Sequence, residues 1–329
     1  MFRNKFISIS ICLPTYNNES TIELCLKSIK SQIYPENLIE IIIIDGGSTD
    51  NTLKICQRFS PVILYNPFKI EEEARAIGIK KSRGEIVAFI DADNILDDEY
   101  FMQKMVEPFI YNQEVVFSEP KFYHCNKEDN IITRYTSLLG ADDAIAVYLG
   151  MYERYCYFKS RWTDFPYETV YKNSTSEIIK LVNLEKMPPF GSNGCFIKKS
   201  ALLNIKYEPF LHTDVIYRML SRNNLFAKVE TGLIHKQSGN LRDFLLKKIR
   251  RVKRNYRKLQ RQYYFPIARK DLILIFLKTF LILPLIKDAI LGYKKRKDLA
   301  WLIHPIIVTL TFFIYAYFLA FRKSQYAIR

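Results

Sequence analysis

The stretch Glu85-Ile-Val-Ala-Phe-Ile-Asp91-Ala-Asp93-Asn94 predicts the fold of the chain around it. Its apolar run, Ile86 to Ile90, has the pattern of a short strand that is buried on both faces of a parallel sheet. Two carboxylates, Asp91 and Asp93, follow where this strand is expected to end. Ligands of open α/β sheets bind outside the carboxyl ends of the strands, and paired carboxylates suit Mg²⁺ or Mn²⁺. An Asp-rich turn without a ligand is the alternative for this motif taken alone.

The chain before this stretch alternates between expected strands and expected helices. The strands are expected at residues 7–13, 39–44 and 62–65, and the helices at 20–31, 51–59 and 71–81. The spacing in Ser20-Thr-Ile-Glu23 is that of a capping box, and Gly46-Gly47 permits a tight turn after the second strand. Because strands and helices alternate, we predict an α/β fold with a parallel doubly wound sheet and acids at its strand ends.

Five further motifs carry a family resemblance when they are taken together with the acidic stretch. They are Leu13-Pro-Thr-Tyr-Asn17, Ile44-Asp-Gly-Gly-Ser-Thr-Asp50, Arg75, Gly191-Ser-Asn-Gly194 and His212-Thr-Asp214. In this order and spacing, the chain resembles an inverting family 2 glycosyltransferase of the hexosyltransferase type over roughly residues 5–240. The resemblance implies the GT-A fold, a Rossmann-like doubly wound sheet. The run Ser137-Leu-Leu-Gly-Ala-Asp-Asp-Ala resembles a segment of a membrane-attached bacterial and archaeal subgroup.

The resemblance implies a set of residues for the nucleotide-sugar donor. Pro14, Thr15 and Asp45 would line the pocket for the base and the ribose, and Glu19 is a further substrate-binding candidate. Arg75 would reach the diphosphate, for which a guanidinium fork is well suited. Many relatives have Asp-Asp where this chain has Asp45-Gly46. The resemblance therefore leaves the nucleotide open among UDP, GDP and dTDP.

The resemblance also implies a divalent cation, Mg²⁺ or Mn²⁺, as the cofactor. Asp91 and Asp93 would hold this metal, with Asp93 the more direct ligand and Asp91 also facing the substrate. The metal would neutralise charge on the departing nucleoside diphosphate. His235 matches a position that reaches the metal or the diphosphate in some members, and a structural role for this histidine is the equal alternative.

Catalysis would depend on Asp214, the general base implied by the resemblance. It would take a proton from the acceptor hydroxyl, and a helix opening at Asp214 would stabilise its ionised form. Many relatives carry Glu-Asp where this chain has Thr213-Asp214, so the neighbouring carboxylate is missing here. Gly191, Asn193 and Gly194 would form a turn on the acceptor side, and a plain tight turn is the alternative.

Positive charge is concentrated toward the C-terminus. The chain has 49 Lys and Arg against 34 Asp and Glu, and residues 242–270 hold twelve of these cations with one acid. Such a block indicates an anionic surface, either nucleic acid or lipid headgroups. Apolar residues from Leu241 to Tyr263 recur at steps of three and four, which predicts a basic amphipathic helix over 241–270 on a membrane surface. A coiled-coil seam is the alternative, and nucleic acid is disfavoured because apolar segments follow directly.

Two apolar segments follow in the predicted membrane region, 271–329. Residues 272–293 are long enough to span a bilayer but contain Lys278, Pro284, Lys287 and Asp288, so a re-entrant element is the alternative. Residues 300–321 have no charged side chain and would cover about 33 Å, enough for a hydrocarbon core of about 30 Å. The cluster at 294–297 favours the cytoplasmic side for that end of the second segment.

Aromatic and cysteine residues are less specific signals. The segment 119–189 is rich in aromatic side chains, which suit either a sugar-binding acceptor cleft or ordinary core packing. The six cysteines are scattered without a Cys-x-x-Cys pair, as expected of small core residues in a reducing compartment. The N-terminal stretch is expected to be the first strand rather than a signal peptide, because Ser8 and Ser10 interrupt its apolar run.

Together these features predict a membrane-attached enzyme with its catalytic domain, residues 1–240, on the cytoplasmic face of the plasma membrane. The enzyme would move a sugar from a nucleotide-sugar donor to a lipid-linked or surface-polysaccharide acceptor, with no nucleic-acid partner. A metal-dependent nucleotidyltransferase is one alternative, although the Gly-rich, Lys-containing loop expected near its N-terminus is missing. A membrane scaffold that binds a nucleotide sugar without turnover is another.

Overall fold

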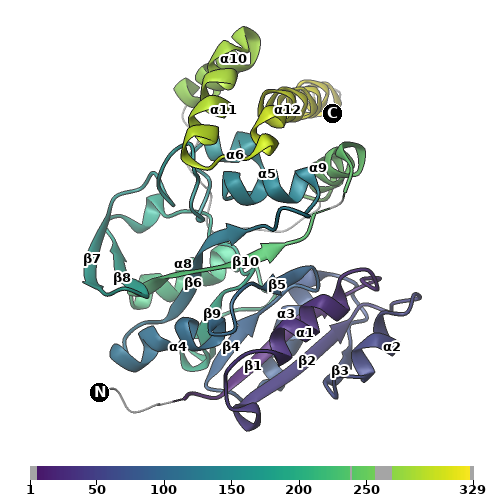
Figure 1. Cartoon of the computed structure of the whole chain (residues 1–329), viewed down its shortest axis with the longest axis vertical. Helices are drawn as coiled ribbons and strands as arrows, with labels where there is room; N and C mark the ends of the chain where they lie inside the picture. Colours follow the sequence, from purple (N-terminus) through teal and green to yellow (C-terminus); the bar gives the residue numbers. More distant parts are fainter. Residues whose placement is uncertain (1–5, 238, 256–268, 327–329) are drawn as a thin grey trace. The chain divides into compact units, whose positions relative to one another are not determined.

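The computed structural model describes residues 6–237, 239–255 and 269–326 (Figure 1). The chain divides into two compact units. The sheet unit comprises Met1–His124 and Phe165–Lys236, and the helical unit comprises Cys125–Asp164 and Gln237–Arg329. The segment 125–164 belongs to the same unit as the C-terminal helices and shares a hydrophobic core with them.

The described part of the sheet unit contains a mixed sheet of ten strands, whose order can be followed in Figure 1. The strands are β1 (Ile9–Thr15), β2 (Ile39–Asp45), β3 (Val62–Tyr65), β4 (Ile86–Phe89), β5 (Asn94–Leu96), β6 (Phe117–His124), β7 (Tyr167–Lys172), β8 (Ser176–Leu181), β9 (Phe196–Lys198) and β10 (Phe226–His235). Their order is β3-β2-β1-β4-β9-β6-β10-β8-β7, and β5 pairs with β10 outside this path.

The predicted parallel arrangement holds for β1 to β4, and β6 is also parallel to β10. Strand β9 is antiparallel to both β4 and β6, and β8 is antiparallel to β10. The predicted parallel sheet is therefore a mixed sheet beyond β4. The β-α-β alternation that favours parallel strands stops at that point of the chain, and β9 joins the sheet from a later loop.

Helices cover both faces of the sheet. They are α1 (Ile22–Lys30), α2 (Thr52–Gln57), α3 (Glu71–Lys81), α4 (Phe101–Tyr111), α7 (Lys199–Leu203) and α8 (His212–Arg222), with short 3₁₀ turns at Glu36–Leu38 and Leu184–Lys186. The expected capping box at Ser20–Glu23 is not formed. Thr21 is the N-cap and its side chain makes no capping bond. Instead, the backbone N–H groups of Thr21 and Ile22 donate to the carbonyl of Asn18.

Alternation along the parallel strands divides their side chains between two layers. On one face, Ile11, Leu13 and Ile43 join a core with apolar residues of α1 and α4. On the other face α3 packs closely, since a Cβ at Gly78 would lie 2.7 Å from Sγ of Cys12. The register pairs Thr15 with Asp45, so the carboxyl ends of neighbouring strands meet at one edge. The candidate site residues follow these strand ends.

The helical unit is built from α5 (Ile131–Leu139), α6 (Ala144–Tyr148), α9 (Leu241–Asn255), α10 (Arg269–Leu281), α11 (Leu283–Lys295), a 3₁₀ turn at Leu299–Ile303 and α12 (His304–Tyr326). Its core includes Tyr135, Tyr152 and Trp301, all buried, so these aromatics serve packing. The predicted basic helix over 241–270 is described as far as Asn255, and its continuation through Tyr263 lies outside the described residues.

The first apolar segment, 272–293, is not one continuous helix. It breaks at Ile282, where φ is 57° and ψ is −41°, and Pro284 lies in the first turn of α11. Within the described residues, Leu299–Phe318 alone has the length and apolarity to cross a membrane. This stretch overlaps the predicted segment 300–321.

Candidate active site

Arg75, which is buried, and Asp91, which is partly exposed, form the centre of the candidate site. Nη2 of Arg75 lies 2.8 Å from Oδ1 of Asp91, and the same nitrogen also pairs with Glu71, one turn earlier on α3. Glu71 is a residue that sequence reasoning missed, although its spacing of four from Arg75 is a recognisable helix pairing signal. The Arg75 side chain is 3% exposed, and its Nε has no hydrogen-bond partner in the part of the chain that the structure describes.

The charges around Arg75 shift two pKa values. Burial would lower the pKa of Arg75, but Glu71 and Asp91 outweigh this effect and raise it. Burial raises the pKa of Asp91 to about 6 against the opposing charge of Arg75, while Glu71 and Asp93 add to the increase. The Asp91 carboxyl is therefore held by the guanidinium, yet is harder to ionise than an ordinary aspartate.

Asp93 and His235 come together because β5 pairs with β10. The register places His235 opposite Asn94, and the backbone N–H of Lys236 donates to the Asp93 carbonyl at 2.9 Å. As a result, Nε2 of His235 lies 3.4 Å from Oδ2 of Asp93. Two neighbouring ligands of an octahedral Mg²⁺ or Mn²⁺ lie about 3 Å apart, so these two atoms fit one such cation.

The three metal candidates are not equivalent. Asp91 gives one oxygen to Arg75, whereas Asp93 and His235 face each other directly. Among the described residues, no three His, Cys, Asp or Glu side chains form a ready-made metal cluster. A cation at Asp93 and His235 would therefore need further oxygen ligands, which the diphosphate of a nucleotide can supply.

The ends of β1 and β2 form a second part of the candidate site. Asp45 is 3% exposed, and its carboxylate accepts hydrogen bonds from the backbone N–H groups of Gly47 and Ser48 at 2.8 and 2.9 Å. Gly47 has φ of +86°, a conformation that glycine adopts without strain. Thr15 lies next to Asp45 in register and donates to Asn18, and Pro14 precedes it on β1.

Exposed side chains surround this turn, and sequence reasoning assigned them no role. Tyr16 and Tyr65 are 51% and 63% exposed, and Nζ of Lys69 lies 5.8 Å from the centre of the Tyr16 ring. Tyr16 lies within the motif Leu13-Pro-Thr-Tyr-Asn17, and its place in that motif is the sequence signal that could have identified it. Glu19, expected at the substrate, accepts hydrogen bonds from the backbone and side chain of Asn51, just before α2.

Asp214 lies in the first turn of α8, which begins at His212 rather than at Asp214 as expected. The Asp214 side chain is 1% exposed. Two contacts fix this end of the helix: Thr213 donates to the Phe190 carbonyl at 3.3 Å, and the Phe210 N–H donates to the Glu72 carbonyl at 3.3 Å. Asp214 is thereby held near both α3 and the segment that leads to Gly191.

The turn at Gly191–Gly194 is tied to the strand that precedes the acids. The N–H of Gly194 donates to the carbonyl of Phe89 at 2.8 Å, so the turn adjoins the end of β4. Gly194 has φ of +74°, and a Cβ there would lie 2.2 Å from Cδ2 of Leu233. Glycine is required at this position for both reasons. Asn193 precedes it in the same turn.

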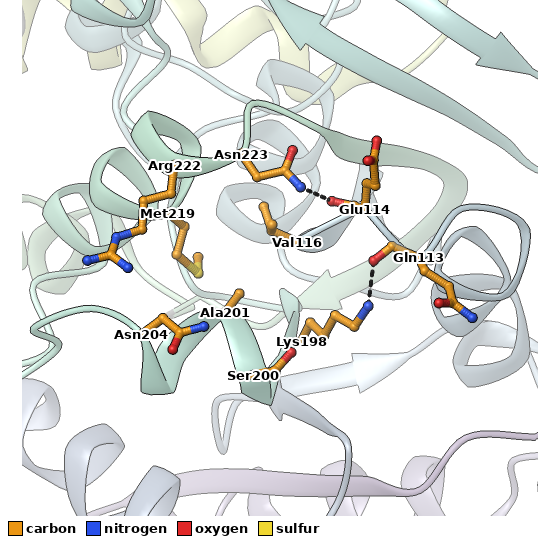
Figure 2. Close-up of a pocket in the computed structure, with 10 residues that line it drawn as sticks. All are labelled: Gln113, Glu114, Val116, Lys198, Ser200, Ala201, Asn204, Met219, Arg222 and Asn223. Carbon is orange, nitrogen blue, oxygen red and sulfur yellow. Dashed lines mark hydrogen bonds between the residues drawn. The ribbon is translucent and has the colours of Figure 1, made fainter.

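A separate pocket of about 360 Å³ lies at the other end of α8 (Figure 2). Arg222 and Met219 line it together with Lys198 from β9 and with Glu114 and Val116, which precede β6. Figure 2 shows Lys198 reaching the carbonyl of Gln113 and Asn223 reaching that of Glu114. This pocket contains none of the predicted site residues, since those follow the opposite ends of the strands.

The fold and the site together define a class: an α/β protein with a charged site at the carboxyl ends of its parallel strands, where nucleotide ligands bind in such proteins. The chain belongs to glycosyl transferase family 2, whose sequence profile matches residues 10–174. Family membership and the mixed α/β sheet support a GT-A fold.

Individual relatives match shorter parts of the chain. Glycosyltransferase AglE of Haloferax volcanii is 37% identical over 91 residues, which are 26% of this chain and 30% of AglE. Glycosyltransferase GlyA of Streptococcus pneumoniae is 30% identical over 163 residues, which are 44% of this chain and 22% of GlyA. The chain thus spans less than a third of the length of either relative.

Two further similarities concern proteins with named substrates. A Methanococcus voltae protein named dolichyl N-acetyl-alpha-D-glucosaminyl phosphate 3-beta-D-2,3-diacetamido-2,3-dideoxy-beta-D-glucuronosyltransferase is 29% identical over 43% of this chain and 44% of its own length. The solved structure of glucosyl-3-phosphoglycerate synthase from Mycobacterium tuberculosis, in complex with Mn²⁺, UDP and glucosyl-3-phosphoglycerate, is 20% identical. The structural alignment covers 73% of this chain and 75% of the chain of the synthase, with a TM-score of 0.47.

Proposed function

We propose that the chain transfers a sugar from a UDP-, GDP- or dTDP-sugar to an acceptor hydroxyl, with inversion at the anomeric carbon and with help from Mg²⁺ or Mn²⁺. The observation that carries this proposal is the pair of contacts at one strand end, Arg75 with Asp91 and Asp93 with His235. Membership of glycosyl transferase family 2 supports the reaction class.

The donor is expected to lie along the carboxyl edge of the parallel strands. Thr15 and Asp45 end neighbouring strands and would hold the nucleoside, where the exposed rings of Tyr16 and Tyr65 also lie. The diphosphate would reach the buried Nε–H of Arg75. A charge-assisted hydrogen bond from this group would stabilise the negative charge that develops on the leaving group.

Asp93 and His235 would hold the divalent cation, and Asp91 would face it from beside Arg75. When bound, the cation would neutralise charge on the departing nucleoside diphosphate. Arg75 keeps Asp91 in place beside this pair, because its guanidinium bridges Asp91 and Glu71.

Asp214 would act as the general base. The acceptor oxygen forms a bond to the anomeric carbon, its proton passes to the Asp214 carboxylate, and the electron pair of the broken glycosyl–oxygen bond leaves with the nucleoside diphosphate. Asp214 lies in the first turn of α8. Gly191, Asn193 and Gly194 would line the acceptor side next to it.

We further propose that the enzyme is attached to the cytoplasmic face of the plasma membrane and acts on a lipid-linked or surface-polysaccharide acceptor. The apolar stretch Leu299–Phe318 and the cationic helix α9 support attachment. The Methanococcus voltae relative, whose name specifies a dolichyl-linked substrate, supports a lipid-linked acceptor.

The test measures release of UDP, GDP or dTDP from a panel of nucleotide sugars, with membrane extract as the acceptor and with Mg²⁺ or Mn²⁺. Release that requires both the extract and the metal, and that is lost in Asp214→Asn, supports transfer. Donor binding without release by the unmutated protein would instead indicate a non-catalytic scaffold. Release of inorganic pyrophosphate from a nucleoside triphosphate would indicate a nucleotidyltransferase.

A further inference from the structure

Helix α12 has one face that solvent reaches and one that packs inside the helical unit. The exposed large side chains of α12 recur at steps of four, three and four along the helix. They are Ile306, Leu310, Phe313 and Tyr317, with exposed fractions of 53, 37, 61 and 57%. The opposite face contributes His304, Ile307, Val308 and Thr311, all buried. The exposed face is apolar and therefore suits contact with lipid, whereas the opposite face packs within the helical unit.

The packed face of α12 meets ionised side chains near the middle of the helix. The hydroxyl of Tyr315 bonds to Asp143, whose carboxylate lies 3.5 Å from Nζ of Lys248 on α9. Nη2 of Arg251, also on α9, lies 3.0 Å from Oδ2 of Asp142. Tyr315 lies within the apolar stretch Leu299–Phe318, three residues before its end, so a membrane-crossing α12 would carry these charges inside one edge of the hydrocarbon core.

Exposed charged side chains on α9 make a membrane-crossing position of α12 energetically less favourable. Arg242 and Arg250 are exposed, and Arg242 lines the groove of about 830 Å³ that separates α9 from α12. An arginine side chain inside the hydrocarbon core is costly. Since α9 runs beside Leu310–Phe318, the second half of the apolar stretch, a crossing α12 would draw α9 and its arginines toward the core with it.

Helices α10 and α11 can also enter a bilayer from one side but are too short to cross it. Each has 13 residues, about 20 Å of helix, which is too short for a hydrocarbon core of about 30 Å. Nζ of Lys278 lies 2.8 Å from Oδ2 of Asp288, so the chain turns back at the break between the two helices (Figure 1). The side chains beside this break, Phe280 and Leu283, are 76 and 74% exposed.

The charges near this apolar surface complement anionic headgroups. Lys287 and the run Lys294–Lys297 are exposed, whereas nearby acids are engaged by the protein: Asp288 by Lys278 and Asp298 by Arg134. Among the described residues, these two acids therefore do not offset the exposed cations. Exposed cations strengthen binding to an anionic leaflet.

We propose that the helical unit enters one leaflet of an anionic membrane without crossing it. The apolar side chains at the turn between α10 and α11 and on the exposed face of α12 insert among the lipid chains, and α12 lies along the bilayer. Lys287 and the Lys278–Asp288 pair, one to two turns from the break, stay at the level of the headgroups. Both ends of the chain then remain on the side of the catalytic unit. This inference rests on the membrane attachment in the proposed function, and it replaces the expectation that 300–321 crosses the bilayer.

Vesicle flotation of the full chain tests the inserted surface. The variant Phe280→Asp/Leu283→Asp is expected to lose about tenfold or more of its partition into phosphatidylglycerol-containing vesicles, because two exposed apolar side chains no longer enter lipid. The control Leu203→Asp, in a side chain of the sheet unit that is 61% exposed, should partition like the unmutated chain. Equal partition of all three proteins would overturn the insertion surface. The insertion surface would also be overturned if the unmutated chain did not bind vesicles and instead formed a dimer that the double variant does not form.

Protease protection of tags at both ends of the full chain tests whether α12 crosses. In sealed inside-out membrane vesicles both tags should be cleaved, and in right-side-out vesicles both should be protected. Cleavage of one tag in inside-out vesicles and of the other in right-side-out vesicles would show that the chain crosses the membrane. That result would overturn the inference that the helical unit enters one leaflet only, but it would not contradict the proposed membrane-attached enzyme. Recovery of the whole chain in the soluble fraction would contradict the membrane attachment itself.

Discussion

Nε2 of His235 lies 3.4 Å from Oδ2 of Asp93, although 141 positions separate the two residues. The pairing of β5 with β10 makes this contact, because it sets His235 opposite Asn94. The distance suits two ligands of one hard cation. It also distinguishes Asp93 from Asp91, which is engaged by Arg75.

We expect Asp93→Ala to abolish the dependence of nucleoside diphosphate affinity on Mn²⁺, since the variant removes the carboxylate that faces His235. Calorimetric titration with and without Mn²⁺ measures this. The control Glu36→Gln changes an acid whose side chain is 81% exposed, and its titration should match that of the unmutated protein. Unchanged affinity and metal dependence in Asp93→Ala would remove Asp93 from the donor site.

Arg75→Lys keeps the positive charge but loses the planar fork that bridges Glu71 and Asp91. We expect donor affinity to fall by about 10- to 100-fold, as for the loss of one charge-assisted hydrogen bond. Titration of the nucleoside diphosphate measures the affinity, and thermal unfolding serves as the control for folding. An affinity within a few-fold of the original would mean that Arg75 is a structural residue only.

Asp214→Asn separates catalysis from binding. The amide keeps the shape of the side chain but cannot take the acceptor proton, so transfer should fall by about 10²–10⁴-fold. Donor affinity should barely change, because Asp214 is assigned to the acceptor. A parallel collapse of donor binding would make Asp214 a donor or structural residue, and turnover within a few-fold of the original would move the base elsewhere.

Asp91 should make the stability of the metal-free protein depend on pH. Its pKa is about 6 in the folded state against an ordinary value of 3.8, so the folded state holds the proton more tightly. The stabilising contribution is therefore complete below pH 3.8 and lost as the pH rises through about 6. The free energy of unfolding, measured with denaturant relative to Asp91→Asn, should fall across this range by up to about 3 kcal/mol. A difference between the two proteins that does not vary with pH would contradict the raised pKa.

Gly194→Ala should destabilise the sheet unit by about 1–3 kcal/mol, because it adds strain at a positive φ and a clash with Leu233. Gly239→Ala is the matched control, since a Cβ at Gly239 has no atom within 4 Å among the described residues. Chemical unfolding measures both variants. Equal stability of the two would show that the turn relaxes without cost.

The local elements, and the residues that follow them, could be predicted from the amino-acid sequence. The alternation of short apolar runs with helical segments predicted β1 to β4 and α1 to α3, because the burial of a parallel strand and the period of a helix are properties of consecutive residues. For the same reason, the sequence was sufficient to predict that Asp45 and Asp91 lie at the ends of strands, at one edge of the sheet.

The contacts between residues far apart in the chain could not be predicted and follow from the folded arrangement of the elements. The antiparallel pairing that brings His235 to Asp93, and the insertion of β9 between β4 and β6, join segments about 80 or more residues apart, and no local period encodes such contacts. The same holds for Lys248, Arg251 and Tyr315, whose partners Asp142 and Asp143 come from a segment about 100 or more residues earlier. The hydropathy of α12 depends only on its own residues. The charged side chains that pack beside it come from α9 and from residues 142 and 143, so the hydropathy of α12 could not reveal them.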